Sequence, residues 1–231
     1  MGRGLLWDHM RRLWRAFLRF FFRLLYNRLA WSYDLVAWLV SLGHWRAWGR
    51  ATLHHLTGQV ILELGHGPGH LLVALEERDF RPVGVDLSPR MVRQAQSRLR
   101  NAGQPVPLVH ARTQALPFRD LAFDTIVATF PTDFILDPAT LHEVTRSMRG
   151  EGRLVVAVGA RFEGEGLIAT FLSWLYQVTG QNKWCLDDFG RRLAEVGLST
   201  RIIPHNVDRT TVLMVVGEKR CRQASSGQST G

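Results

Sequence analysis

Glycine and acidic residues are concentrated where the chain could bind a nucleoside. Residues 60–72 (Val-Ile-Leu-Glu-Leu-Gly-His-Gly-Pro-Gly-His-Leu-Leu) predict a buried strand, a tight turn at Gly65, Gly67 and Gly69, and a helix start. Glycine lets the backbone approach a ligand closely, and the first turn of a helix presents unpaired amide donors. A dinucleotide-binding turn would have a third glycine at the position of His70, so the spacing is a weak signal for that class.

Two acids at the ends of predicted strands narrow the choice of ligand. Asp86 ends the apolar run 83–85, about twenty residues beyond the turn, where a carboxylate can accept two hydrogen bonds from a ribose diol. Glu63 lies at the end of the first strand, and a buried acid needs a partner. S-adenosylmethionine (SAM) offers positive charge on its ammonium and sulfonium groups. Two acids without a phosphate-binding lysine therefore favour SAM over a nicotinamide dinucleotide.

The elements that position these residues follow an alternating pattern. From residue 60 onward, short apolar runs alternate with helical patterns, which is typical of a parallel sheet with crossover helices. The sequence predicts a doubly wound, mostly parallel, seven-stranded α/β sheet of the Rossmann-like class, with an antiparallel hairpin at one edge. The predicted strands are 60–64, 82–86, 105–111, 123–129, 152–159, 199–206 and 211–218.

Helix start and stop signals agree with this pattern. Ser88-Pro89 predicts a helix that is capped by serine and begins with proline, and residues 101–103 (Asn-Ala-Gly) predict its end. Pro138 predicts the start of a second helix that runs through Met148 and ends at Gly150.

Length and charge limit the function classes. The 231 residues suit one α/β domain of ordinary size plus an appendage. The net charge is +9, but residues 1–50 hold nine arginines against two aspartates, so the rest of the chain is nearly neutral and nucleic acid is an unfavoured partner. Two distant cysteines, Cys185 and Cys221, give no sign of a disulfide framework or a cysteine-rich metal site, and we predict no metal.

The first 50 residues form a predicted basic, amphipathic, helical extension. Its arginines lie opposite an apolar face, which suits a helix that lies in a bilayer interface. Three interpretations stay open: a cap or lid over the domain itself, peripheral membrane contact through residues 5–25, and an organellar transit peptide. The apolar face consists of Met10, Leu13, Trp14, Phe17, Leu18, Phe21, Leu24 and Leu25.

Four motifs in register resemble those of class I SAM-dependent methyltransferases, and in particular the ubiquinone/menaquinone-biosynthesis type of domain. The resemblance covers roughly residues 55–160. The four matching motifs are the glycine-rich turn, the acid expected to bind the ribose (Asp86), and two later segments at 112–118 and 123–131. The resemblance implies a SAM-binding methyltransferase domain at 51–220. The tail at 221–231 is predicted to be disordered because residues 224–231 offer no apolar content to bury. The resemblance implies these cofactor-binding residues: Glu63, Gly65, His66, Gly67, Gly69, Asp86, Leu87, Thr113, Gln114 and Thr129.

Two positions depart from the family pattern. The family usually has an aspartate that accepts a hydrogen bond from adenine where this chain has Arg112, and arginine cannot accept one. We therefore assign the adenine contact to Thr113, Gln114 or the backbone. His66 replaces the usual cysteine of the turn, and we expect it to pack or to position the backbone.

Methyl transfer from a sulfonium is an in-line displacement that depends mainly on alignment and exclusion of water. A base is needed only if the acceptor loses a proton. Asp133, just after the fourth strand, is the candidate, and a solvated loop acid or helix cap is the alternative. Tyr33, Phe130 and Phe134 are candidate acceptor contacts, with ordinary core packing as their alternative.

The sequence thus predicts a SAM-dependent methyltransferase that acts on a small hydrophobic acceptor. Residues 129–134 do not match the Asn/Asp-Pro-Pro-Tyr motif of many amine and base methyltransferases, which disfavours RNA methylation. A non-catalytic SAM-binding or scaffolding protein is the main alternative. The expected location is the cytoplasm, with peripheral contact on the inner face of the membrane as an option.

Overall fold

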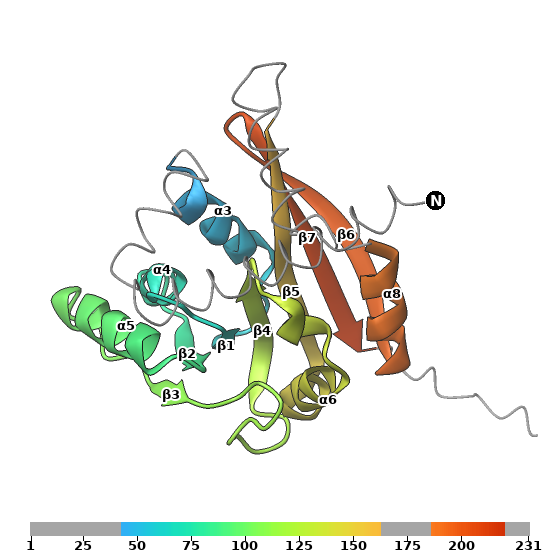
Figure 1. Ribbon diagram of the computed structural model, residues 1–231, viewed down its shortest axis with the longest axis horizontal. Helices are drawn as coiled ribbons and strands as arrows, with labels where there is room; N and C mark the ends of the chain where they lie inside the picture. Colours follow the sequence, from blue (N-terminus) through green and yellow to red (C-terminus); the bar gives the residue numbers. More distant parts are fainter. Residues whose placement is uncertain (1–42, 163–185, 220–231) are drawn as a thin grey trace, which may run out of the picture.

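The computed structural model describes residues 43–162 and 186–219 (Figure 1). The amphipathic face predicted for residues 5–25, the candidate acceptor residue Tyr33 and the tail predicted at 221–231 lie outside the described residues. Among the described helices, none is long and apolar enough to cross a membrane.

A seven-stranded sheet forms the centre of the fold, in the order β3-β2-β1-β4-β5-β7-β6 (Figure 1). Neighbouring strands are parallel from β3 to β5, whereas β7 is antiparallel to both β5 and β6. The predicted doubly wound class and the antiparallel edge hairpin are confirmed. The strands are β1 (Val60–Leu64), β2 (Arg81–Asp86), β3 (Leu108–His110), β4 (Phe123–Thr129), β5 (Met148–Phe162), β6 (Leu198–Val207) and β7 (Thr210–Lys219).

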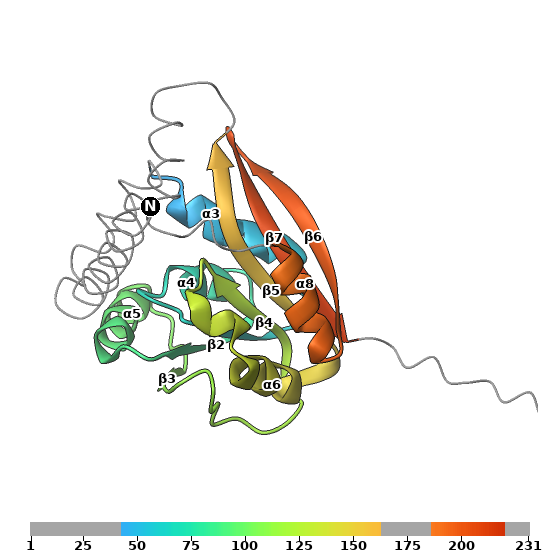
Figure 2. The same ribbon diagram turned by 45° about the vertical axis from the view of Figure 1, so that its right-hand side comes forward.

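Helices cover both faces of the sheet (Figure 2). On one face α4 and α5 pack on apolar side chains such as Ile61 and Val127, and on the other α6 and α8 pack on Leu62 and Ile126. This opposite placement of neighbouring residues is the period-two pattern of a strand buried on both faces. The helices are α3 (Trp45–Ala51), η2 (Thr52–His55), α4 (His70–Glu76), α5 (Pro89–Asn101), η3 (Asp133–Leu136), α6 (Pro138–Ser147) and α8 (Leu186–Glu195).

Two predicted boundaries are wrong, for identifiable reasons. The helix from Pro138 ends at Ser147 instead of continuing through Met148, because Met148 is fully buried and pairs with Phe123 as the first residue of β5. The strand predicted at 105–111 is only Leu108–His110. It is an edge strand that pairs only with β2, and prolines at 105 and 107 cannot donate to a ladder.

The helix α3 docks onto the long strands β5 and β7. Trp48 is fully buried, and its indole nitrogen donates to the hydroxyl of Thr210 at 2.8 Å. Its ring packs among Ala157 and Met214 of these strands. The helix crosses the predicted boundary between residues 50 and 51, so the last residues of the predicted extension pack on the sheet and bring α3 beside α4 (Figure 1).

Candidate active site

The glycine-rich turn connects β1 to α4 through three left-handed residues. Gly65, Gly67 and Gly69 have φ of 67°, 52° and 80°, a region that side chains disfavour. The amide of Gly65 donates to the carbonyl of Val85 at 2.8 Å, which holds the start of the turn against β2. The turn thus places its backbone at the carboxyl ends of two adjacent parallel strands.

Asp86 ends β2 and binds the same turn. One carboxylate oxygen accepts from the amide of Gly67 at 2.9 Å, and the other accepts from the amide of Ser88 at 2.7 Å. Each oxygen keeps further acceptor capacity, so the fixed carboxylate can still receive a diol. The neighbouring Leu87 is 61% exposed, so its side chain is accessible to a ligand at the end of β2.

Glu63 is a buried acid without a partner. Its side chain is 1% exposed, and Oε2 has no hydrogen-bond partner among the described residues. Burial raises the pKa of the Glu63 carboxyl well above its usual value, and the charge of Asp86 raises it further. A buried carboxyl of this kind requires a cationic ligand before it can ionise without penalty.

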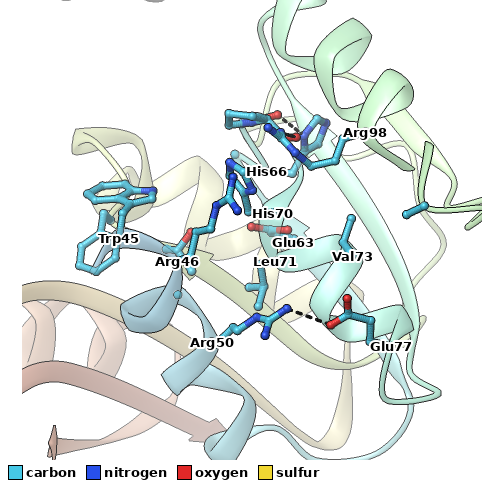
Figure 3. A pocket seen from close by; sticks show the side chains of 17 residues that line it. Trp45, Arg46, Arg50, Glu63, His66, His70, Leu71, Val73, Glu77 and Arg98 are labelled. Atoms are coloured by element: carbon cyan, nitrogen blue, oxygen red, sulfur yellow. Dashed lines mark hydrogen bonds and ion pairs between the residues drawn. The ribbon is translucent and has the colours of Figure 1, made fainter. Parts of the chain in front are cut away.

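A cavity of ≈ 320 Å³ opens beside Glu63, between the turn, α3 and the end of β4 (Figure 3). It brings together Glu63, Gly65, His66 and Gly67 with Thr129 and Phe130 from the carboxyl end of β4. From α3 it receives Trp45, Arg46, Gly49 and Arg50, and from the start of α4 it receives His70 and Leu71.

His66 packs beneath the turn. The residue is 3% exposed, and Nδ1 lies 2.7 Å from the carbonyl oxygen of Gly67. A Cβ placed on Gly84 would lie 2.8 Å from the His66 ring, so this ring fits against β2 only because residue 84 is glycine. Burial lowers the pKa of His66, although Asp86 acts in the opposite direction. These contacts favour the predicted packing and backbone-positioning role.

Comparisons with known proteins agree with this geometry. Residues 61–152 match the family model described as a methyltransferase domain. The ubiquinone/menaquinone biosynthesis C-methyltransferase of Enterobacter sp. is 28% identical over 191 residues, covering 79% of this chain and 73% of the relative. The demethylmenaquinone methyltransferase of Mycolicibacterium paratuberculosis is 33% identical over 57% of this chain and 56% of its own. This chain thus aligns with only about half the length of the second relative.

Solved structures share the fold. A protein of Methanococcus maripaludis, assigned to the SAM-dependent methyltransferases, superposes with a TM-score of 0.63 at 18% identity, over 86% of this chain and 96% of that one. The geranyl diphosphate C-methyltransferase of Streptomyces coelicolor, solved with S-adenosyl-L-homocysteine, gives 0.58 at 16% identity, over 75% and 79%. Together, the matched residues 61–152, the relatives and the shared fold support a class I SAM-dependent methyltransferase.

The cofactor is SAM, and the site of this methyltransferase fits it. The orphaned oxygen of Glu63 suits a cationic group, and the fixed carboxylate of Asp86 suits a ribose diol. The residues predicted to bind the cofactor lie in three places. Glu63, Gly65, His66, Gly67 and Thr129 line the cavity, and Gly69 belongs to the same turn without lining it. Asp86 ends β2, and Leu87 follows it.

Thr113 and Gln114 lie on the loop between β3 and β4, where their side chains bind α6. The hydroxyl of Thr113 is 3.1 Å from that of Thr140, and the Gln114 amide donates to Asp137 at 3.1 Å. Arg112 is exposed on the same loop. The side-chain contacts therefore fix the loop, and direct contact of Thr113 or Gln114 with adenine stays a prediction.

Aromatic side chains gather at the carboxyl end of β4. Phe130 has φ of 47°, and its ring lies 4.5 Å from the Trp45 ring, centroid to centroid. Such a backbone outlier in a bulky residue is typical of a functional position. Phe134 packs on the turn, because a Cβ on Gly65 would lie 3.3 Å from its ring. Both aromatic rings therefore border the glycine-rich turn or the cavity beside it.

The candidate base lies apart from the cavity. Asp133 is exposed at the first position of η3 and does not line the cavity. Its role as a catalytic base is therefore still only a prediction. Sequence reasoning missed Trp45 and Arg46 as site residues. Their arginine- and tryptophan-rich segment resembles the preceding extension in composition, and nothing local marks the point where the chain joins the sheet.

Proposed function

We propose that this methyltransferase transfers a methyl group to a small hydrophobic acceptor that binds against Trp45 and Phe130. The observation that carries the proposal is the pairing of these rings beside Thr129 in the wall of the cavity that Glu63 also lines. Aromatic surface next to the cofactor position favours an apolar ring or chain over a polar metabolite.

The names of similar proteins support this class of acceptor. The Enterobacter and Mycolicibacterium relatives are named for the biosynthesis of quinones, and the Streptomyces structure is named for geranyl diphosphate. Quinones and geranyl diphosphate each combine a polar or reactive group with a hydrocarbon part.

When bound, SAM supplies an electrophilic methyl group. The chain contributes orientation: Asp86, fixed by the amide of Gly67, holds the ribose end, and the unpaired oxygen of Glu63 faces the positive charge. The rings of α3 and Phe130 exclude water from the reacting atoms. Where the acceptor must lose a proton, Asp133 is the proposed base, and it would have to reach the site from η3.

The N-terminal extension is proposed to bring the enzyme to its substrate. Its basic, amphipathic residues 5–25 would lie on the inner face of the membrane, with the enzyme in the cytoplasm. Co-sedimentation with vesicles tests this point. Binding to vesicles with anionic lipid, weakened by replacing Arg11, Arg12 and Arg15 with glutamine, is expected, and no binding to either anionic or neutral vesicles would contradict it.

Radiolabelled SAM tests the acceptor class. The enzyme is incubated separately with lipophilic quinols and catechols, with polar metabolites and with RNA. The label transferred to each acceptor is counted after the acceptor has been separated from unreacted SAM. We expect transfer to a lipophilic acceptor and a rise in its KM for Trp45→Leu. Phe118→Leu, which truncates an aromatic ring packed on Phe123 instead of the cavity, is the matched control. Transfer confined to RNA or polar acceptors would contradict the proposal.

A further inference from the structure

The helices on the two faces of the sheet differ in charge. On one face, α3, α4 and α5 together contain six arginines and one glutamate. On the other face, α6 and α8 together contain three arginines and four acids. The positive charge of the helices is therefore concentrated on one face of the domain, and α5 contributes most of it.

The chain enters the domain on this basic face through α3 (Figure 2). Val155 of β5 packs with α4, and Ala157, two residues further along the same strand, packs with Trp48 of α3. Side chains two residues apart on a strand point to the same face of the sheet, so α3 and α4 share a face. The predicted basic extension thus connects to the domain on the face that also carries α5.

The outer face of α5 presents arginines to solvent. Arg90, Arg93 and Arg100 are exposed, and none of the three forms an ion pair within residues 43–162 and 186–219. The helix contains no acid, so it offers no partner one turn away. The fourth arginine, Arg98, differs because it donates to the carbonyl of Pro68. Three charges of α5 are therefore directed outward.

Helix stability does not explain this charge. Arg90 lies in the first turn of α5, where the helix dipole disfavours a cation, whereas the first turn of α8 contains two aspartates. Only Arg100, in the last turn, is placed where the dipole favours it. On the neighbouring α4, Glu77 already pairs with Arg50 at 2.9 Å. The arginines of α5 thus favour an anionic partner outside the domain.

We propose that the exposed face of α5 binds the anionic headgroups of a membrane surface. Clustered arginines are attracted to such headgroups, and α5 contains no aromatic residue on which a nucleic-acid base could stack. α5 begins three residues beyond the end of β2, so Arg90 and Arg93 lie near the edge of the sheet that holds the cavity. The inference rests on the proposed lipophilic acceptor, because such a compound partitions into the bilayer.

Co-sedimentation of the full chain with vesicles tests this surface. The vesicles contain phosphatidylcholine alone or with about one third phosphatidylglycerol. Arg93→Gln combined with Arg100→Gln should lower binding to the anionic vesicles at least about tenfold and leave the affinity for SAM unchanged. Arg191→Gln combined with Arg192→Gln removes the same charge from α8, on the opposite face, and is the matched control. This control should retain vesicle binding.

Four outcomes would overturn the inference. Equal losses in the two double variants would show that net charge alone matters. Unchanged vesicle binding by the α5 variant would leave membrane contact to the extension, and loss of RNA binding instead would make α5 a nucleic-acid surface. The fourth outcome is that the unaltered protein binds neither kind of vesicle.

The acceptor assay separates this inference from the proposed function. Lipophilic acceptors dissolved in neutral detergent need no contact between the enzyme and a charged membrane. Methyl transfer to them, together with any of the four outcomes above, would leave the proposed function standing and reject only the role of α5. Failure of that transfer would count against the proposed acceptor class itself.

Discussion

The amide of Gly67 donates to the carboxylate of Asp86 at 2.9 Å, which couples the glycine-rich turn to the end of β2. The same carboxylate accepts from Ser88, the residue that caps α5. One acid therefore connects the turn to the start of a helix, at the position where we propose that the ribose binds. Changes on either side of this contact should affect both the geometry of the turn and the affinity for SAM.

Gly69→Ala is expected to destabilise the protein by about 2 kcal/mol or more. The φ of 80° strains any side chain, and a new Cβ would also lie 2.8 Å from Cβ of Ala95 on α5. Gly103→Ala is the matched control, because φ is 69° there and no atom lies within 4 Å. Urea denaturation of both variants measures the difference, and equal losses would show that the contact with Ala95 costs nothing.

Glu63→Gln is expected to stabilise the free protein and to weaken SAM binding. Because burial raises the pKa of Glu63 above the ordinary value of 4.5, the folded state holds a proton that the unfolded chain releases as pH rises through that value. Stability of the unaltered protein therefore falls above about pH 4.5, and glutamine removes this loss. Denaturation at pH 7 should show a gain of about 0.5–2 kcal/mol, and the gain should shrink at pH 4.

Calorimetric titration of the same variant with SAM measures its effect on cofactor affinity separately from its effect on stability. Glu63→Gln should bind SAM about tenfold less tightly, because a neutral amide replaces the acid that faces the cation. A variant that is less stable than the unaltered protein at pH 7 would contradict the buried, unpartnered state of Glu63.

Three histidines join the segment before β1 to the outer strand β6. The ring of His205 stacks on His54 at 4.9 Å and meets the edge of His55 at 5.3 Å, centroid to centroid. Burial lowers the pKa of both His55 and His205, and the charge of Arg153 adds to the effect on His55. Arg153 in turn pairs with Glu218 at 3.0 Å.

Stability is therefore expected to fall as the medium becomes acidic. Because the folded pKa values lie below the ordinary value of 6.5, the unfolded chain binds protons first, and stability declines as pH falls below about 6.5. His205→Gln should flatten this dependence by about 1 kcal/mol between pH 7.5 and 5.5. His142→Gln, an exposed position on α6, is the control. An unchanged slope in His205→Gln would exclude the cluster as its source.

The sequence was most informative where local chemistry determines structure. The turn at Gly65–Gly69 and the strand at 123–129 could be predicted because glycine spacing and buried strands leave local patterns. The full length of β5 could not, because its last residues pair only with β7, about fifty residues away along the chain. The arrival of Arg46 at the cavity depends on Trp48 docking between distant strands, which no local pattern reports.

Calorimetric titration with SAM and, separately, with NAD tests the central claim most directly. We predict saturable binding of SAM, no binding of NAD, and loss of SAM binding in Asp86→Ala, because the turn and the ribose end both depend on that carboxylate. Asp86→Asn, which keeps acceptor capacity but removes the charge, should retain weaker binding, and thermal melts establish that each variant is folded. Absence of SAM binding by the unaltered chain, or a preference for NAD, would contradict the assignment of this site.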